Sequence, residues 1–212
     1  MANFHYIIAG LPDLVLDYEA SGYDFESLYS HISSMSSPKE RRCMQWLMFG
    51  LREENLNNHF YRASLKSPVK FIREYFTADL EIRNIQVAVV ARKNSLDPTP
   101  YIIGNNEFSE QLRTSRANDF GVANISENAA ELLKIMEIGN ILDREQQLDL
   151  YRWQKANEIC TFNYFDINVI LSFLLKASIV KRWNMLDKKR GAVIFKQFVD
   201  EVKGSFKMEK NY

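Results

Sequence analysis

The stretch VKFIREYFTADLEIRNIQVAVVARKN, residues 69–94, is the part of the sequence that decides the fold class. On a helical wheel of about 100° per residue, its apolar side chains gather into one broad arc. These side chains are Phe71, Ile72, Tyr75, Phe76, Leu80, Ile82, Val87, Val89 and Val90. The stretch therefore predicts one long amphipathic helix, whose apolar face packs against a core or a partner.

Two charged residues, Asp79 and Arg83, interrupt this apolar arc near its middle. They are four residues apart, so we expect their side chains to face each other one turn up the helix. A lone buried charge is costly, whereas a paired and hydrogen-bonded one is tolerated. Two interpretations stay open: a core ion pair that fixes the register between helices, or a pair that meets a partner protein or a third group.

Lys176 is one candidate for that third group. Residues 165–186 are apolar on nearly all sides, which predicts a central, buried helix. On this helix Lys176 shares a face with Val169, Ile179 and Trp183. We therefore treat a contact between Lys176 and Asp79 as a hypothesis that the structure can test.

Three further helix starts are indicated along the chain. Ser37-Pro38-Lys39-Glu40 combines a capping serine, a proline at the first helical position and a capping-box carboxylate. Ser67-Pro68 repeats the signal ahead of the long helix, and Ser126 could start another. Residues 143–159 and 188–207 have the pattern of amphipathic helices, while residues 6–12 could form a strand or a first helical turn.

The composition agrees with a helical protein. The 212 residues include 8 Gly and 5 Pro, which are too few breakers for a many-stranded sandwich. The sequence contains no linker that is long enough to require two domains. We predict an all-α multi-helix bundle forming a single helical domain over residues 1–212, with irregular segments near residues 94–106 and 113–125.

The charge balance argues against nucleic acid as a partner. Lys plus Arg and Asp plus Glu are 27 each, and a nucleic-acid binder usually has a basic excess. Two small basic clusters, Arg92-Lys93 and residues 188–190, sit at predicted helix ends, where cations favour the helix dipole.

The sequence contains none of the common catalytic or phosphate-binding motifs. Two Ser-x-x-Lys patterns, at Ser36 and Ser67, coincide with helix starts and are better explained by capping. His5, His31 and His59 are scattered, and the two cysteines are isolated. We therefore expect no catalytic residue, no cofactor and no metal, and hence no enzyme.

Three stretches resemble a bacterial family of uncharacterised proteins, which are encoded with the V-type ATP synthase and are similar to its C-type subunit, named d in eukaryotes. The stretches are YIIAGLPDL at residues 6–14, YFTADLEIRNI at residues 75–85 with its continuation to Lys93, and FNYFDIN at residues 162–168 with its continuation to Trp183. The second stretch is the most specific, because C-type subunits have a similar acidic, apolar, Arg-Asn helix.

The resemblance implies an all-helical, non-catalytic subunit or accessory protein that links the central stalk of the rotary ATPase to its proteolipid ring. Partners would be other V-type ATP synthase subunits, and the protein would be cytoplasmic, reaching the inner membrane and its proton or sodium transport only through the complex. Candidate structural or interface residues are Asp79, Arg83, Asn84, Lys176 and Trp183. The C-type subunit has three related helical units, so this shorter chain would be a reduced version or an accessory factor.

Two other functions remain open from the sequence. The chain could be a stand-alone helical adaptor or regulatory protein with another partner. An enzyme without a familiar motif would instead require a deep pocket in which titratable groups converge.

Overall fold

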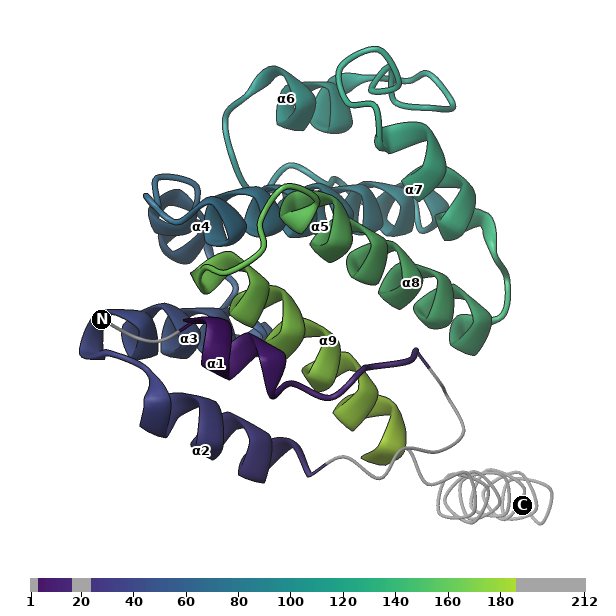
Figure 1. Ribbon diagram of the computed structural model, residues 1–212. Helices are drawn as coiled ribbons and strands as arrows, with labels where there is room; N and C mark the ends of the chain where they lie inside the picture. Colours follow the sequence, from purple (N-terminus) through teal and green to yellow (C-terminus); the bar gives the residue numbers. More distant parts are fainter. Residues whose placement is uncertain (1–3, 17–23, 186–212) are drawn as a thin grey trace, which may run out of the picture.

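The computed structural model describes residues 4–16 and 24–185, and within these ranges the regular structure is entirely helical. The predicted all-α multi-helix bundle is therefore confirmed (Figure 1). The helices, in chain order, are α1 (Phe4–Ala9), α2 (Phe25–Met35), α3 (Pro38–Gly50), the short 3-10 helix η1 (Glu53–Asn55), α4 (Asn58–Ser64), α5 (Lys70–Lys93), α6 (Glu107–Thr114), α7 (Ala129–Glu137), α8 (Ile141–Cys160) and α9 (Ile167–Met185).

Helix α9 is central, as its apolar sequence predicts. It packs against α1, α2, α3, α5 and α8, and most of its side chains are buried. In Figure 1 it crosses behind α1 and between α3 and α8. A helix that is covered on all sides needs apolar residues around its whole circumference, which explains why no polar stripe is visible in its sequence.

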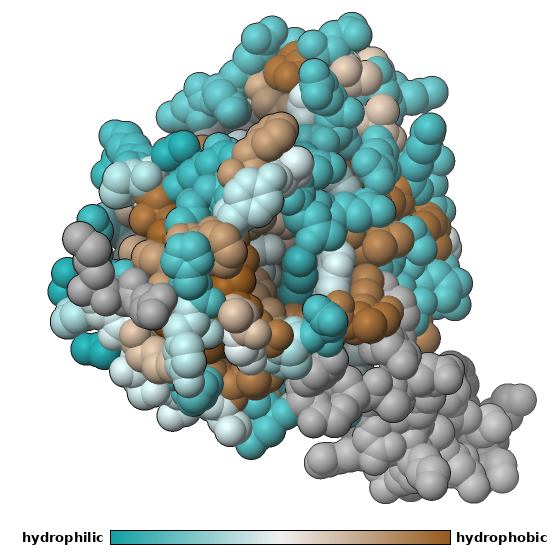
Figure 2. Space-filling model, in the orientation of Figure 1, coloured by the Kyte–Doolittle hydropathy of each residue, from teal (hydrophilic) through white to brown (hydrophobic). Residues whose placement is uncertain are grey.

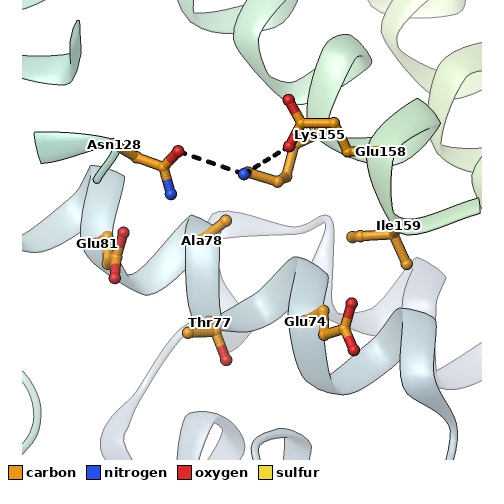
Figure 3. A pocket seen from close by; sticks show the side chains of 8 residues that line it. All are labelled: Glu74, Thr77, Ala78, Glu81, Asn128, Lys155, Glu158 and Ile159. Atoms are coloured by element: carbon orange, nitrogen blue, oxygen red, sulfur yellow. Dashed lines mark hydrogen bonds and ion pairs between the residues drawn. The ribbon is translucent and has the colours of Figure 1, made fainter. Parts of the chain in front are cut away.

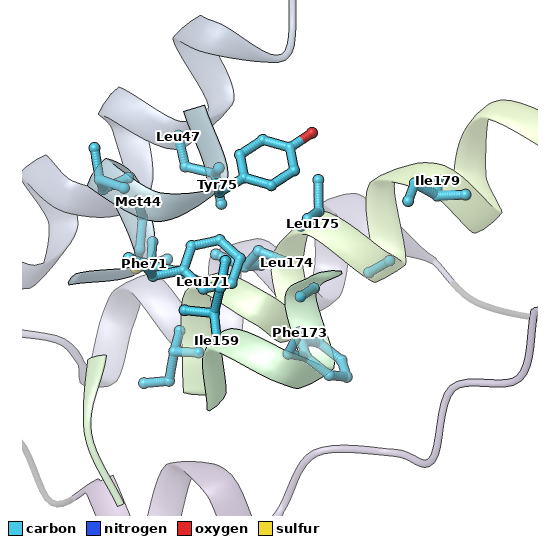
Figure 4. Packing of buried hydrophobic residues seen from close by; sticks show 14 of the residues in the cluster. Met44, Leu47, Phe71, Tyr75, Ile159, Leu171, Phe173, Leu174, Leu175 and Ile179 are labelled. Carbon is cyan, nitrogen blue, oxygen red and sulfur yellow. The ribbon is translucent and has the colours of Figure 1, made fainter. Parts of the chain in front are cut away.

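Helices α5 and α8 each run through two separate groups of buried side chains. The first group joins the N-terminal half of α5 to α3, α4 and α9, and Figure 4 shows its packing around Phe71, Tyr75 and Leu171. The second group joins the C-terminal half of α5 to α6, α7 and the start of α8, around Ile85, Leu132 and Leu148. The two long helices therefore hold the two apolar groups together.

The start signals read from the sequence have mixed outcomes. Ser37 caps α3 with a complete capping box, as predicted, because its backbone N–H donates to Glu40 while its hydroxyl accepts from the Glu40 N–H. Ser67 instead accepts from the N–H of Val69, and α5 begins only after Val69. Ser126 also starts no helix, because its hydroxyl donates to Glu81 of α5.

The ends of the chain complete this comparison. Residues 6–12, for which a strand or a helical turn was possible, contain most of α1 followed by Gly10 and extended chain. The predicted tail helix at residues 188–207 lies outside the described residues. Irregular chain is present where it was expected, between α5 and α6 and between α6 and α7.

Gly50, the last residue of α3, shows how closely the first apolar group is packed. A methyl group built on Gly50 would lie 2.3 Å from Cζ of Phe60 and 2.4 Å from Cζ of Phe76. Both rings are buried and meet edge to face. Helix α3 can therefore approach α4 and α5 this closely only because residue 50 has no side chain.

We predict that Gly50→Ala destabilises the protein by about 1–3 kcal/mol, the usual cost of overpacking a core. In an unobstructed helix the same change would stabilise the protein, because alanine has the higher helix propensity. Urea denaturation of both proteins measures the difference. Gly139→Ala is the matched control, since nothing lies within 4 Å of its added methyl group, and it should be close to neutral. Equal stability of the Gly50→Ala variant and the wild type would contradict the packing.

Candidate functional site

The most deeply buried charge of the described residues is the carboxylate of Asp149, on α8. Its side chain is 1% exposed, and donors from two helices surround it. Arg152, one turn further along α8, donates from Nη1 at 3.1 Å, and Trp183 of α9 donates from Nε1 at 2.6 Å. The guanidinium of Arg182, also on α9, makes a further ion pair with the same carboxylate. The burial of Asp149 is tolerated because each carboxylate oxygen has at least one donor.

Asp79 of α5 extends this network to a third and a fourth helix. Its carboxylate accepts a hydrogen bond of 2.8 Å from the hydroxyl of Tyr61 on α4. Its ion pair is with Arg152, whose Nε lies 3.8 Å from Oδ1. Asp79, Asp149, Arg152, Arg182, Tyr61 and Trp183 are together called the buried ion network. The network connects α4, α5, α8 and α9.

The partner of Asp79 corrects two expectations from the sequence. Arg83 lies one turn along the same helix but makes no hydrogen bond or ion pair with Asp79, although its charge still acts on it. Lys176 is not the third group either. Its ammonium lies 5.4 Å from the centre of the Trp153 ring, in a separate hollow that Cys160 and Leu11 also line. The ion pair of Asp79 is therefore made by Arg152, and not by Arg83 or Lys176.

Burial and charge act in opposite directions on the network. Burial raises the pKa of Asp79, while Arg152 and the Tyr61 hydroxyl lower it by a smaller amount, so the pKa remains above its usual value. Burial alone would lower the pKa of Arg152, but the negative charges around it, including Asp79 and Asp149, raise the value overall. Arg152 therefore stays positively charged between the two carboxylates.

The remaining candidate residues have separate positions. Trp183 belongs to the network itself. Asn84 is buried, and its side-chain amide donates to the carbonyl of Ile103 at 2.7 Å and accepts from the Ile103 N–H at 3.0 Å. This pair of bonds fixes the irregular segment after α5 against the helix. Asn84 is thus a structural residue on the opposite side of α5 from the network.

A cleft of about 550 Å³ opens beside the network. Its walls come from α3, η1, α5, α8 and α9. Charged residues such as Arg52, Arg83 and Arg182 line it together with apolar residues such as Met48 and Leu175. A concave site of this volume has the size of a small-molecule site.

A smaller hollow of about 320 Å³ lies on the other side of α5 (Figure 3). Lys155 is placed there between Asn128 and Glu158, with Nζ 3.3 Å and 2.7 Å from their oxygens. Glu81 lines the same hollow, and burial raises the pKa of its carboxyl, an effect that the Ser126 hydrogen bond reduces. The carboxylates here are already occupied by donors of the chain.

Exposed aromatic side chains gather at the connection between α8 and α9. Phe162 is 84% exposed, Tyr164 70% and Phe165 48%. The Phe165 ring stacks on His5 of α1, with ring centres 3.9 Å apart. We call Phe162, Tyr164 and Phe165 the aromatic patch. In Figure 2 hydrophobic side chains reach a largely hydrophilic surface in the region where α1 crosses α9.

Metal binding and membrane crossing find no support in residues 4–16 and 24–185. Within these ranges no three His, Cys, Asp or Glu side chains are grouped so that they could hold a metal ion. None of the helices in the same ranges combines the length and apolar character that crossing a bilayer requires.

The sequence contained one signal for the network that the helical wheel of α5 could not show. Asp149 and Arg152 are three residues apart in α8, next to the buried Leu148 and Tyr151. Charged residues on the apolar face of two different helices indicate an ion pair between those helices. Arg182 and Tyr61 give no such signal, because their roles depend on how the helices cross.

We predict that Asp149→Ala destabilises the protein by about 3–5 kcal/mol, because it leaves Arg152 buried without its main partner. Urea denaturation at neutral pH measures the loss. Asp143→Ala is the control on the same helix: Asp143 is exposed in the first turn, so only a helix-dipole effect of about 0.3–1 kcal/mol is expected. Similar losses in the two variants would show that the network contributes no special stability.

We also predict that Glu81→Gln makes the protein relatively more stable as the pH rises. Because the pKa of Glu81 is raised in the folded protein, the contribution of this carboxyl to the free energy of unfolding is fully present below its unfolded pKa of about 4.5. It is lost as the pH rises through the folded pKa. Glutamine can still accept the Ser126 hydrogen bond and does not ionise. The free energy of unfolding, measured from acid to neutral pH, should therefore favour the variant increasingly, while Glu54→Gln at an exposed position should show no such trend. A constant difference between Glu81→Gln and wild type would contradict the pKa shift.

Comparison with known proteins gives the chain a family but no activity. The chain matches no curated protein and no solved structure. A family described as "Protein of unknown function (DUF2764)" matches residues 50–205, which include every helix of the buried ion network. The chain belongs to the DUF2764 family.

Proposed function

We propose that this protein is a non-catalytic subunit or accessory protein of a V-type rotary ATP synthase, which links the central stalk to the membrane ring. The proposal begins with the three stretches that resemble the family related to the C-type subunit. They correspond to α1, to α5 and to the α8–α9 connection with α9. Helix α9 packs against both α1 and α5, so the three stretches share one region of the fold.

The aromatic patch is the observation that favours a docking protein most directly. Three large aromatic side chains within four residues are about half exposed or more. Single exposed apolar residues are ordinary, but grouped ones mark interaction sites. Aromatic residues are enriched at protein interfaces because they bury a large area and lose little conformational entropy. The patch lies in the third stretch that resembles the family, and we therefore propose it as the docking surface for the assembly.

The buried ion network fits the proposed task of passing torque. Helix α9 starts just after the aromatic patch, and in its last turn Arg182 and Trp183 hold Asp149 of α8. A protein between two moving parts must transmit force without changing its internal packing. Directional bonds between helices resist sliding better than apolar contacts alone.

The location and partners of the protein follow from this proposal. It would be cytoplasmic, bound to the central stalk and the proteolipid ring, and peripheral to the inner membrane only through the complex. Proton or sodium transport would belong to the assembly and not to this chain. A stand-alone adaptor that uses the aromatic patch for another partner is the second candidate.

We predict that the wild-type protein co-purifies with rotary ATPase subunits from native membranes, and that Phe162→Ser/Tyr164→Ser weakens this capture at least about tenfold. Removing interface aromatics commonly costs about 2 kcal/mol or more, and about 1.4 kcal/mol is tenfold in affinity. Quantitative mass spectrometry of the captured subunits provides the measurement. Leu96→Ser/Tyr101→Ser is the matched control, because these two side chains are also exposed but lie in the segment after α5.

Three outcomes are distinguishable in this experiment. Capture of stalk or ring subunits that depends on the aromatic patch supports the proposal. Capture of a different protein through the patch favours the adaptor. Absence of all rotary ATPase subunits, under conditions that keep the ATPase intact, would refute the proposed function.

A further inference from the structure

Of the five cations that line the cleft beside the buried ion network, Arg83 has a buried nitrogen without a partner. Arg83 of α5 lines the cleft, and its guanidinium makes no hydrogen bond or ion pair with any described residue. Its Nε is shielded from solvent and has no acceptor. A buried donor without a partner costs free energy, more so when it is charged, and so requires a physical explanation.

The other charges of the cleft already have partners or lie at its rim. Asp149 is held by Arg152, Arg182 and Trp183, and Asp79 by Tyr61 and Arg152, as described above. Lys181 makes an ion pair with Glu26 of α2. Asp79 acts on Arg83 only through its charge at longer range. The guanidinium of Arg83 therefore has no acceptor among the described residues.

The balance of charge in the cleft is positive, although the whole chain is neutral. Five cationic side chains line it, against the three carboxylates of Glu53, Asp79 and Asp149, and because Glu26 pairs with one of the five, Lys181, one positive charge remains in excess. The five are Arg52, Arg83, Arg152, Lys181 and Arg182. A concave site with an excess of one sign of charge concentrates its field and attracts the opposite sign.

The apolar residues that line the cleft set the second requirement for a ligand. Met48, Leu51, Ile82 and Leu175 contribute to it. A bare inorganic ion would leave this surface uncovered, whereas a ligand with a hydrocarbon or aromatic body would cover it. The volume of about 550 Å³ suits a small organic molecule better than a folded segment of a partner.

We propose that this cleft binds a small organic oxyanion, a carboxylate or phosphate on an apolar body, with Arg83 as the main ligand-binding residue. The guanidinium of Arg83, which lines the cleft, donates to the oxyanion. The planar guanidinium forms paired bonds with carboxylate or phosphate, which a lysine cannot reproduce. Arg52, exposed at the rim, adds attraction from a distance. This binding site is independent of the aromatic patch and of the proposed place in an ATP synthase.

Calorimetric titration of the full chain with phenyl phosphate and with benzoate tests the proposal. We expect at least one probe to bind with a dissociation constant of about 1 mM or below, which corresponds to about 4 kcal/mol. Arg83→Gln should weaken this binding at least about tenfold, as expected when a charge-assisted paired contact of about 1.5–3 kcal/mol is lost. Arg83→Lys should weaken it less, because the charge remains. Preference for one probe assigns the oxyanion as phosphate or carboxylate.

Three controls make the result specific. Benzamide has the same ring without the charge and should not bind. Arg116→Gln removes an exposed cation outside the cleft and should bind the probes like the wild type. Arg52→Gln should weaken binding measurably, by up to about fivefold, the range of an exposed charge, and unchanged binding by this variant counts against the cleft if Arg83→Gln fails to fold.

The proposal is overturned if neither probe binds at millimolar concentration, if a folded Arg83→Gln variant binds as well as the wild type, or if benzamide binds equally. None of these results bears on capture of ATPase subunits, which tests the proposed function separately.

Discussion

The carboxylate of Asp149 is the point on which the helix arrangement depends. It is almost completely buried and takes donors from its own helix, α8, and from α9. Arg152 then carries the network from Asp149 to Asp79 on α5, whose carboxylate holds the Tyr61 hydroxyl of α4. Because a buried charge tolerates no loss of partners, each of these helices must keep its register relative to the others.

The cleft follows from the same constraint. Asp79, Asp149 and Arg152 all line it, and apolar side chains packed over these charges would leave them without polar contact on that side. Elsewhere, α5 and α8 contribute to two well-packed groups of buried apolar side chains.

The sequence predicted the elements that depend on local pattern. The limits of α5, the start of α9 to within two residues and the capping box of Ser37 were found, because periodicity and capping act within a few residues. Ser126 was misjudged, since its hydroxyl bonds to the distant Glu81 of α5 in place of capping a helix. The partner of Asp79 was missed for the same reason. Spacing on one helix indicates Arg83, but the acceptor is occupied by Tyr61 and Arg152 from other helices, and Lys176 lies in a different hollow.

Helix α9 connects the aromatic patch to the buried ion network. The patch directly precedes α9, whose far end supplies Arg182 and Trp183 to Asp149. A partner that pulled on Phe162 or Tyr164 would therefore load α9 along its length, and the network would pass that load to α8 and, through Arg152, to α5. An apolar contact could slide under such a load, whereas the indole N–H of Trp183 reaches its carboxylate only at one register. A ligand at Arg83 would bind one helical turn from Asp79 on α5, next to the residues that join α5 to α8.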